Sequence, residues 1–108
     1  MFRERMKGNL DLLVLAMLVA APAHGYEIAD RLRHRSDGAF DLPEGTIYPA
    51  LHRLEARGWV TSSWVQAGGR KRRVYALTSS GHRQLSAQRR EWAAFTAGMA
   101  AVLGMEPA

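Results

Sequence analysis

The segment from Gly45 to Val60 constrains the fold of this chain more than any other stretch. Its apolar residues Ile47, Leu51 and Leu54 recur at intervals of four and three, which predicts a short helix with one buried stripe. The opposite face is mostly polar or cationic and carries Thr46, Tyr48, Pro49, His52, Arg53 and Arg57. A basic helix of this kind suits the major groove of DNA, although a solvated surface helix has the same charge pattern.

The composition favours a nucleic acid as the partner. The chain has 108 residues, which suits a single domain, and a formal net charge of +5. Of its 15 cationic residues 13 are arginine, whose planar guanidinium matches phosphate and guanine edges. A membrane surface or an acidic protein is the alternative for such a charge. The absence of cysteine excludes disulfides and thiolate metal sites, and fits the reducing cytoplasm, where we expect the protein.

The N-terminal segment predicts a buried helix over residues 3–20, ending before Pro22 because a proline disfavours helix in the residue that precedes it. Its basic start, the apolar run 12–21 and the small residues 21–23 also resemble a signal peptide. Cleavage there would remove a core helix from an already small domain. The run is also shorter than the about 20 apolar residues that span a bilayer. We therefore expect a core helix and no membrane partner.

A second helix is predicted from Gly25 or Tyr26 to about His34, with Ile28 and Leu32 facing inward. Its predicted outer face carries Glu27, Asp30, Arg31 and Arg33. The cluster 36–38 predicts a turn. After a brief extended piece, Pro43 and Glu44 form the first turn of the helix that contains Ile47.

A hairpin with a basic tip follows this helix. Gly58 ends the helix, because glycine adopts a left-handed conformation at least cost. Strands are predicted over residues 59–66 and 72–77, joined by a turn at 67–69. The tip and flank hold four consecutive cations, Arg70, Lys71, Arg72 and Arg73. Their mutual repulsion would be relieved by a polyanion, which favours phosphate contact over the alternative of a solvated turn. A basic hairpin beside a basic helix predicts a wing.

The last predicted helix begins after Thr78, a good N-cap, and continues for about 24 residues or about 36 Å. A heptad seam runs along it through Leu85, Gln88, Trp92, Phe95, Met99 and Val102. Such a helix is longer than a small domain needs to cover itself. We expect it to mediate dimerisation, because Trp92 and Phe95 would otherwise be left partly in water. The alternative is a helix folded back on its own core.

With these elements in this order, the chain resembles the PadR family of bacterial transcriptional regulators, specifically its short members with a single C-terminal helix. The resemblance extends from residue 10 to about residue 92. It is carried by residues 24–28 (HGYEI), by residues 45–55 (GTIYPALHRLE) with Gly58 and Trp64, and by residues 73–81 (RVYALTSSG) with Gly69 and Arg70. The Gly-Thr-Ile-Tyr-Pro run followed by the Leu-Glu pair is the most specific of these matches.

The resemblance implies a winged helix-turn-helix fold, α+β and mostly helical. Residues 1–78 would be the DNA-binding domain, and residues 79–105 a C-terminal dimerisation helix packed on it in one compact unit. The homodimer would be made chiefly by the last helix and by the first, including Leu12. The DNA contacts implied on a palindromic operator are Tyr26, Thr46, Tyr48, Pro49, His52, Arg53, Arg70, Lys71, Arg72 and Arg73. Family members are mostly repressors released by small aromatic or lipophilic effectors.

Several of these residues keep a second interpretation. His52 is either a phosphate or base-edge donor or a plain exposed histidine, and Tyr48 is either a DNA contact or a packing residue. Trp92 either fills a dimer core or borders a gap between subunits and stacks on a flat ligand. The four histidines are scattered, so no metal site is expected, and no motif supports catalysis or a cofactor. The rival functions are a winged-helix module that binds proteins and a nonspecific nucleic-acid binder.

Overall fold

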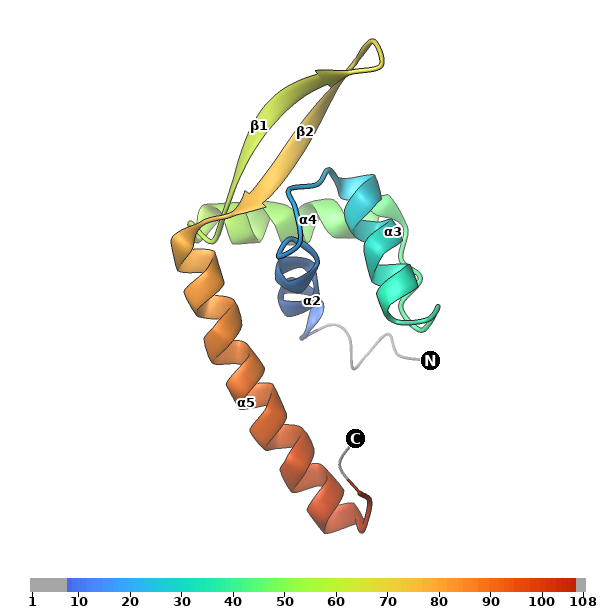
Figure 1. The fold of residues 1–108 in the computed structure, drawn as a ribbon, viewed down its shortest axis with the longest axis vertical. Coiled ribbons are helices and arrows are strands. Elements are labelled where there is room, and N and C mark those ends of the chain that lie inside the picture. The colour runs from blue at the N-terminus through green and yellow to red at the C-terminus, as the bar shows by residue number, and fades with distance from the viewer. Residues whose placement is uncertain (1–7, 107–108) are drawn as a thin grey trace.

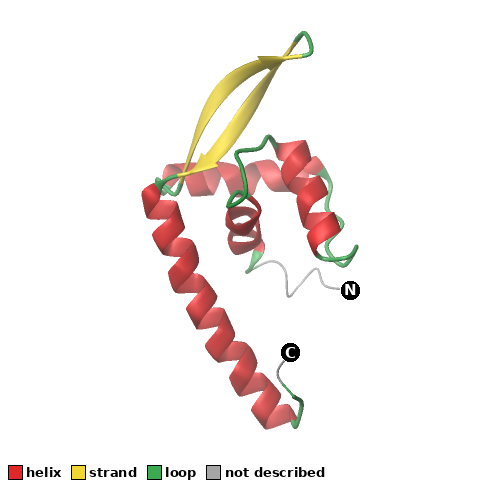
Figure 2. Ribbon diagram, in the orientation of Figure 1, coloured by secondary structure: helices red, strands yellow, loops and turns green. Residues whose placement is uncertain are grey.

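A computed structural model of the chain describes residues 8–106. Within them the elements follow the predicted order (Figure 1). These elements are the helices α2 (Leu10–Met17), α3 (Gly25–Arg35) and α4 (Glu44–Ala56), the strands β1 (Val60–Ala67) and β2 (Arg70–Leu77), and the helix α5 (Ser79–Leu103). The helices α2, α3 and α4 form the body of the molecule, and Figure 2 shows the hairpin rising from one side of it and α5 leaving in the opposite direction. The prediction of a mostly helical α+β fold with a two-stranded wing is confirmed.

The core lies where α2, α3, α4 and the base of the hairpin meet. The predicted stripe of α4, Ile47, Leu51 and Leu54, is completely buried. Other large side chains that are almost completely buried in the core are Val14, Leu15, Ile28, Leu32, Tyr75 and Leu85. Removing this apolar surface from water stabilises the fold by about 25 cal/mol for each Å². The stripe thus fixes which face of α4 is left for function.

The hairpin is tied to the helices through the loop between α2 and α3. The backbone N–H of Ala23 donates to the carbonyl of Tyr75 at 3.0 Å, and the N–H of Tyr75 donates back at 2.9 Å. A two-stranded ribbon is only marginally stable by itself. This bridge and the buried Tyr75 ring therefore anchor the wing to the body.

The first helix is shorter than predicted. Residues 3–7 of the predicted range lie outside the described residues, and the described helix begins at Leu10 and ends at Met17 rather than Ala20. A guanidinium from α3 stabilises this early end, because Arg31 donates to the carbonyl oxygens of Met17 at 3.0 Å and Ala21 at 2.8 Å. The prediction that Arg31 faces outward is therefore wrong, because its guanidinium lies against the end of α2.

Helix α3 begins and ends as predicted to within about one residue. Ile28 and Leu32 are buried, which confirms the predicted inner face. Its first turn is held by a reciprocal cap. The backbone N–H of His24 donates to Glu27 Oε1 at 3.1 Å, and the N–H of Glu27 donates to His24 Nδ1 at 3.4 Å.

The turn of the hairpin consists of Gly68 and Gly69 alone. Both have positive φ, 58° and 77°, which a two-residue hairpin turn requires and which glycine adopts without steric cost. Strand β2 therefore starts at Arg70, two residues earlier than predicted, and pairs from Ala67↔Arg70 to Val60↔Leu77. The four cations consequently lie along a strand, where alternate side chains point to opposite faces.

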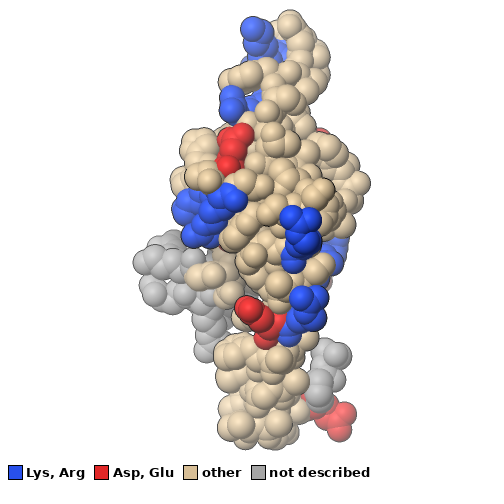
Figure 3. Space-filling view, turned by 90° about the vertical axis from the view of Figure 1, so that its left-hand side faces the viewer, with Lys and Arg blue, Asp and Glu red and all other residues tan. Residues whose placement is uncertain are grey.

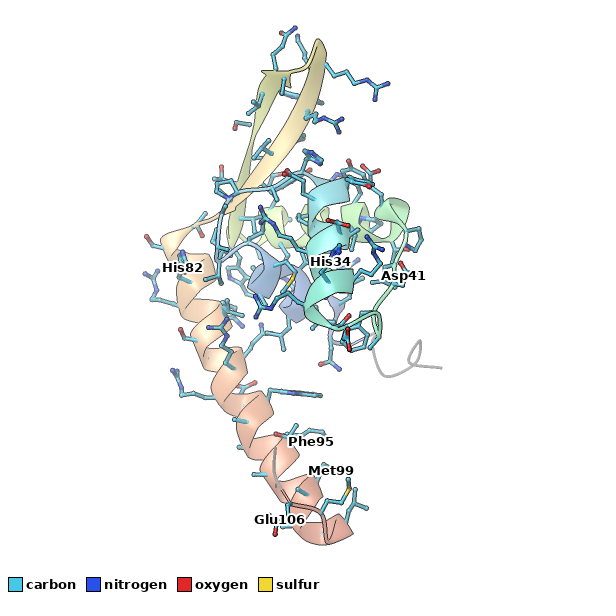
Figure 4. The ribbon with its side chains drawn as sticks, turned by 45° about the vertical axis from the view of Figure 1, so that its right-hand side comes forward. His34, Asp41, His82, Phe95, Met99 and Glu106 are labelled. Carbon is cyan, nitrogen blue, oxygen red and sulfur yellow. The ribbon has the colours of Figure 1, made fainter. Side chains whose placement is uncertain are left out.

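Helix α5 starts where the sequence predicts. Thr78 Oγ1 accepts from the N–H of Gly81 at 3.0 Å and donates to the carbonyl of Gly58 at 2.7 Å, so it caps the helix and joins it to the end of α4. Leu85 is buried, whereas Phe95 is 57% exposed and Val102 is 87% exposed in the single chain. Figure 4 shows Phe95 and Met99 on the part of α5 that extends beyond the body. The division into a DNA-binding domain and a dimerisation helix stays a prediction.

Candidate nucleic-acid interface

The exposed side chains of α4 are divided between two sides of the helix. Tyr48 and His52 line a groove that also includes residues of the wing. Thr46, Pro49 and Arg53 line a separate hollow beside α2 and the loop before α4. The sequence predicted one donor-rich face, whereas the structure brings these residues together as two neighbouring groups.

The groove between α4 and the wing combines positive charge with aromatic rings. It is lined by His24, Tyr48, His52, Trp64, Lys71, Arg72, Arg73 and Tyr75. Figure 3 shows Lys and Arg on the wing and again in separate groups on the body below it. Cations positioned in this way neutralise phosphates, and the neighbouring hydroxyl and imidazole groups can form hydrogen bonds to a nucleic acid. The groove joins the predicted helix residues to the predicted wing residues.

Tyr48 is held by contacts within the protein. Its hydroxyl donates to Glu44 Oε1 at 2.7 Å, and its ring lies on Gly25, where an added Cβ would be 2.8 Å from Tyr48 Cζ. The hydrogen bond to Glu44, with partial burial, raises the pKa of Tyr48 from 10 to about 12. The hydroxyl proton is therefore committed to Glu44, which leaves the oxygen lone pairs available to accept. Tyr48 thus packs on Gly25 and lines the groove, while its hydroxyl pairs with Glu44.

The wing cations are not equivalent. Arg73 stacks over Trp64 at 5.3 Å, donates through Nε to Ser62 Oγ at 3.0 Å, and approaches Glu55 Oε1 of α4 at 3.9 Å. These contacts hold the wing against the helix and occupy part of the guanidinium. Arg70 and Lys71 are exposed near the hairpin tip, so they are better placed for phosphates.

In the hollow beside α2, one carboxylate holds the cations of α4. Asp11 accepts from Arg53 Nη2 at 2.7 Å and from Arg53 Nε at 3.2 Å, and Arg57 Nη1 lies 3.9 Å from its second oxygen. The bond to Asp11 raises the pKa of Arg53 further above its ordinary value. Arg57 also lies over the Trp59 ring, at 5.1 Å. One carboxylate thus partly compensates two cations, Arg53 of α4 and Arg57, which follows the helix.

The acidic partners Asp11, Glu44 and Glu55 are the residues that sequence reasoning missed. Glu44 and Tyr48 are four residues apart in one helix, so this pair was visible in the sequence. Asp11 precedes Arg53 by 42 residues, and no local pattern indicates such a pair.

The remaining predicted residues lie at three other places. Tyr26 is 60% exposed in the first turn of α3, with its ring centroid 6.4 Å from that of His24. Leu12 and Gln88 are partly buried in the single chain. On α5, the rings of Trp92 and Phe95 lie 5.5 Å apart in a tilted arrangement. Within residues 8–106, no three His, Cys, Asp or Glu side chains come together as metal ligands.

Residues 14–87 match the Transcriptional regulator PadR-like family. The chain belongs to the PadR family. The matched range includes the second half of α2, all of α3, α4 and the wing, and the start of α5. It is therefore a DNA-binding transcriptional regulator, and because PadR proteins are regulators rather than enzymes, the sequence prediction of a non-enzyme is confirmed.

Relatives and solved structures agree with this family. A transcriptional regulator of Mycobacterium tuberculosis, Rv3488, is 36% identical over 89 residues, which are 82% of this chain and 79% of the relative. A PadR family regulator of Eggerthella lenta superposes with a TM-score of 0.82 at 31% identity, covering 98% of this chain and 91% of that one. A PadR family regulator from Clostridium difficile superposes with a TM-score of 0.78 at 34% identity, covering 88% of this chain and 98% of that one. These PadR structures confirm the winged-helix fold.

Among the described helices, none combines the length and the apolar character that crossing a bilayer requires.

Proposed function

We propose that this PadR protein is a homodimeric repressor that recognises a palindromic operator in the cytoplasm and is released from it by a small aromatic or lipophilic effector. The observation that carries the DNA-binding part is the groove in which Tyr48 and His52 of α4 lie beside Lys71 and Arg72 of the wing. Groups on a helix and on a ribbon converge there, which suits a duplex backbone beside a groove of the DNA.

Two kinds of contact would divide the work of binding. Phosphates are neutralised by Arg70, Lys71 and Arg72, which position the protein on the DNA. Arg73 holds the wing against α4. Thr46, Tyr48, Pro49, His52 and Arg53 meet base edges in the major groove, and Tyr26 approaches the backbone beside them. If a dimer neutralises six to ten phosphates, its affinity falls by about 10³–10⁵ between 50 and 200 mM salt.

The seam of α5 supports dimerisation. Trp92, Phe95 and Met99 are 45%, 57% and 46% exposed in the single chain, and an apolar row of this kind is seldom left in water. A second copy packed antiparallel or parallel against the same row would cover it by two-fold symmetry. Leu12 and Gln88, both only partly buried, would extend the contact toward the body.

The effector part of the proposal rests on the aromatic pair of α5. The rings of Trp92 and Phe95 are adjacent and tilted, and a planar ligand would stack on the face of Trp92 near the dimer axis. Quenching of tryptophan fluorescence by planar aromatic compounds, lost in Trp92→Ala and kept in Trp64→Ala, would support this role. A broad panel of such compounds without quenching would leave Trp92 as a dimer-core residue alone.

The function is tested by a gel shift on the DNA upstream of the protein's own gene, in parallel with sedimentation at micromolar concentration. We expect a dimer, a discrete shifted band, and weaker binding by Arg72→Ala. A dimer that shifts no fragment would favour the rival protein-binding module. Shifts of equal strength on unrelated duplexes would favour a nonspecific binder.

A further inference from the structure

The Asp11–Arg53 pair is a contact between the first helix and the helix that the proposed function places in the major groove. Both oxygens of Asp11 accept from the same guanidinium, one from Nε and one from Nη2. Asp11 is only partly exposed, with 24% of its side chain accessible, whereas 48% of Arg53 is accessible. The carboxylate of Asp11 is thus the more buried member of the pair, and the guanidinium of Arg53 is the more exposed one.

The geometry leaves one edge of the arginine free. A guanidinium has N–H donors on two further sides after Nε and one N–H of Nη2 are engaged. The second N–H of Nη2 and one N–H of Nη1 form the end-on edge, and that edge matches the O6 and N7 acceptors of guanine. Because Asp11 holds the other edge, Arg53 loses less side-chain freedom when it binds.

The surroundings of the pair favour base reading over simple charge. Thr46 and Pro49, the other predicted base-facing residues on this side of α4, line the same hollow as Asp11 and Arg53. A carboxylate at this place also repels phosphates, so it penalises any arrangement in which Arg53 meets only the DNA backbone. Arg57 Nη1, at 3.9 Å from Asp11 Oδ2, places a second cation beside the carboxylate.

Resting on the proposed DNA-binding function, we infer that Asp11 is a positioning residue that presents the end-on edge of Arg53 to a guanine in each operator half-site. The inference assigns a specificity role to a residue outside the helix-turn-helix segment. It also assigns the base that Arg53 reads. Asp11 itself touches no DNA in this arrangement.

The test uses full-length protein and operator duplexes in which each guanine is replaced in turn by 7-deazaguanine, which lacks the N7 acceptor. Inosine is the matched control base, since it keeps O6 and N7 and lacks only the minor-groove amino group. For the unmodified protein we expect one guanine in each half-site at which 7-deazaguanine weakens binding about tenfold while inosine changes it little. At that position Asp11→Asn should bind the guanine and the 7-deazaguanine duplexes within about twofold of each other. The same is expected of Arg53→Ala, which removes every donor of the side chain.

Further readouts separate positioning from a merely structural role. The Asp11→Asn variant should bind unrelated DNA more tightly than the unmodified protein, because each protomer loses one negative charge beside the duplex. The variant that carries both the Asp11 and the Arg53 substitution should distinguish guanine from 7-deazaguanine no worse than either single variant does. Asp30→Asn, which breaks the comparable Asp30–Arg33 pair on α3, is the matched control and should keep the tenfold discrimination.

Three results would overturn the inference. One is full sensitivity to 7-deazaguanine in Asp11→Asn, and another is the absence of any sensitive guanine. The third is an equal loss of affinity of Asp11→Asn for all duplexes, which would indicate that Asp11 only stabilises the fold. Arg53→Ala retains Asp11 and checks the base contact separately. If the unmodified protein selects no operator at all, the proposed function fails and this assignment falls with it.

Discussion

Gly81 lies directly against the backbone of Trp59. A Cβ added to Gly81 would be 2.0 Å from the Trp59 carbonyl oxygen, a separation that nonbonded atoms do not adopt. The same oxygen accepts from the N–H of Thr78 at 3.1 Å. The start of α5 is therefore fixed on the backbone at the foot of the wing, so the proposed dimer helix and the proposed DNA-binding wing share one rigid joint.

Replacing this glycine should weaken the joint. Gly81→Ala forces a methyl group onto the Trp59 carbonyl, which is backbone and cannot move aside cheaply, so we expect a loss of about 1–3 kcal/mol in the free energy of unfolding. Denaturant unfolding at fixed protein concentration measures it. Gly45→Ala is the control, because a Cβ there meets nothing within 4 Å and the helix gains a better helix former. Equal stability of the two variants would contradict the close contact.

The hydrogen bond between Tyr48 and Glu44 predicts an alkaline titration. The unfolded chain releases the Tyr48 proton near pH 10, whereas in the folded protein the pKa is about 12. Because the folded state holds the proton more tightly, the stability that this bond contributes is complete below pH 10 and is lost as the pH rises from 10 to about 12.

Ultraviolet titration of the tyrosinate band measures this directly. We expect a step near pH 12 that is missing in Tyr48→Phe and that moves toward 10 in Glu44→Gln, because the amide offers a weaker acceptor than the carboxylate. If Glu44→Gln leaves the step in place, Glu44 is not its cause.

The wing cations should differ in what they contribute. Lys71 is exposed, so Lys71→Ala should reduce the slope of log Kd against log salt by about one phosphate contact for each wing and leave unfolding unchanged. Arg73→Ala removes the stacking on Trp64 and the bond to Ser62, so it should also lower the free energy of unfolding, by about 0.5–1 kcal/mol. Identical effects of the two variants on the free energy of unfolding would contradict the different roles of Lys71 and Arg73.

The end of α2 depends on a guanidinium from α3. Arg31→Gln should destabilise the protein by about 1–2 kcal/mol, because the carbonyl oxygens of Met17 and Ala21 lose a charged donor. Thermal unfolding checks this. Arg33→Gln is the matched control on the same helix, since the Arg33 guanidinium pairs with Asp30 at the surface and should contribute little.

The helices and the wing were predictable because their signals are local. The spacing of Ile47, Leu51 and Leu54 placed the buried face of α4, and Thr78 marked the start of α5. The predicted turn at 67–69 was one residue too long, because the sequence does not show that Gly68 and Gly69 suffice to reverse the chain. Boundaries of this kind depend on backbone conformation rather than on composition.

The exposed face of α4 was predictable from the sequence, and the contacts of its side chains were not. Helical periodicity indicated which residues of α4 are exposed, yet it could not show that Tyr48 rests on Gly25 or that Arg53 is held by Asp11. Both facts depend on how α2 and α3 pack across α4, which brings together residues far apart in the sequence. Three acidic side chains thus organise a site that the charge pattern presented as purely cationic.

The most direct measurement is equilibrium binding to an operator selected from genomic fragments, with its two half-sites moved apart in single base-pair steps. A dimer with two fixed α4 helices should bind best when the half-site centres are separated by about 10 base pairs, one helical turn or about 34 Å, or by a multiple of it. Binding should weaken sharply when about 5 base pairs are added, because the second half-site then faces away. Affinity independent of the spacing, with one protomer on each half-site, would contradict a dimeric regulator of this form.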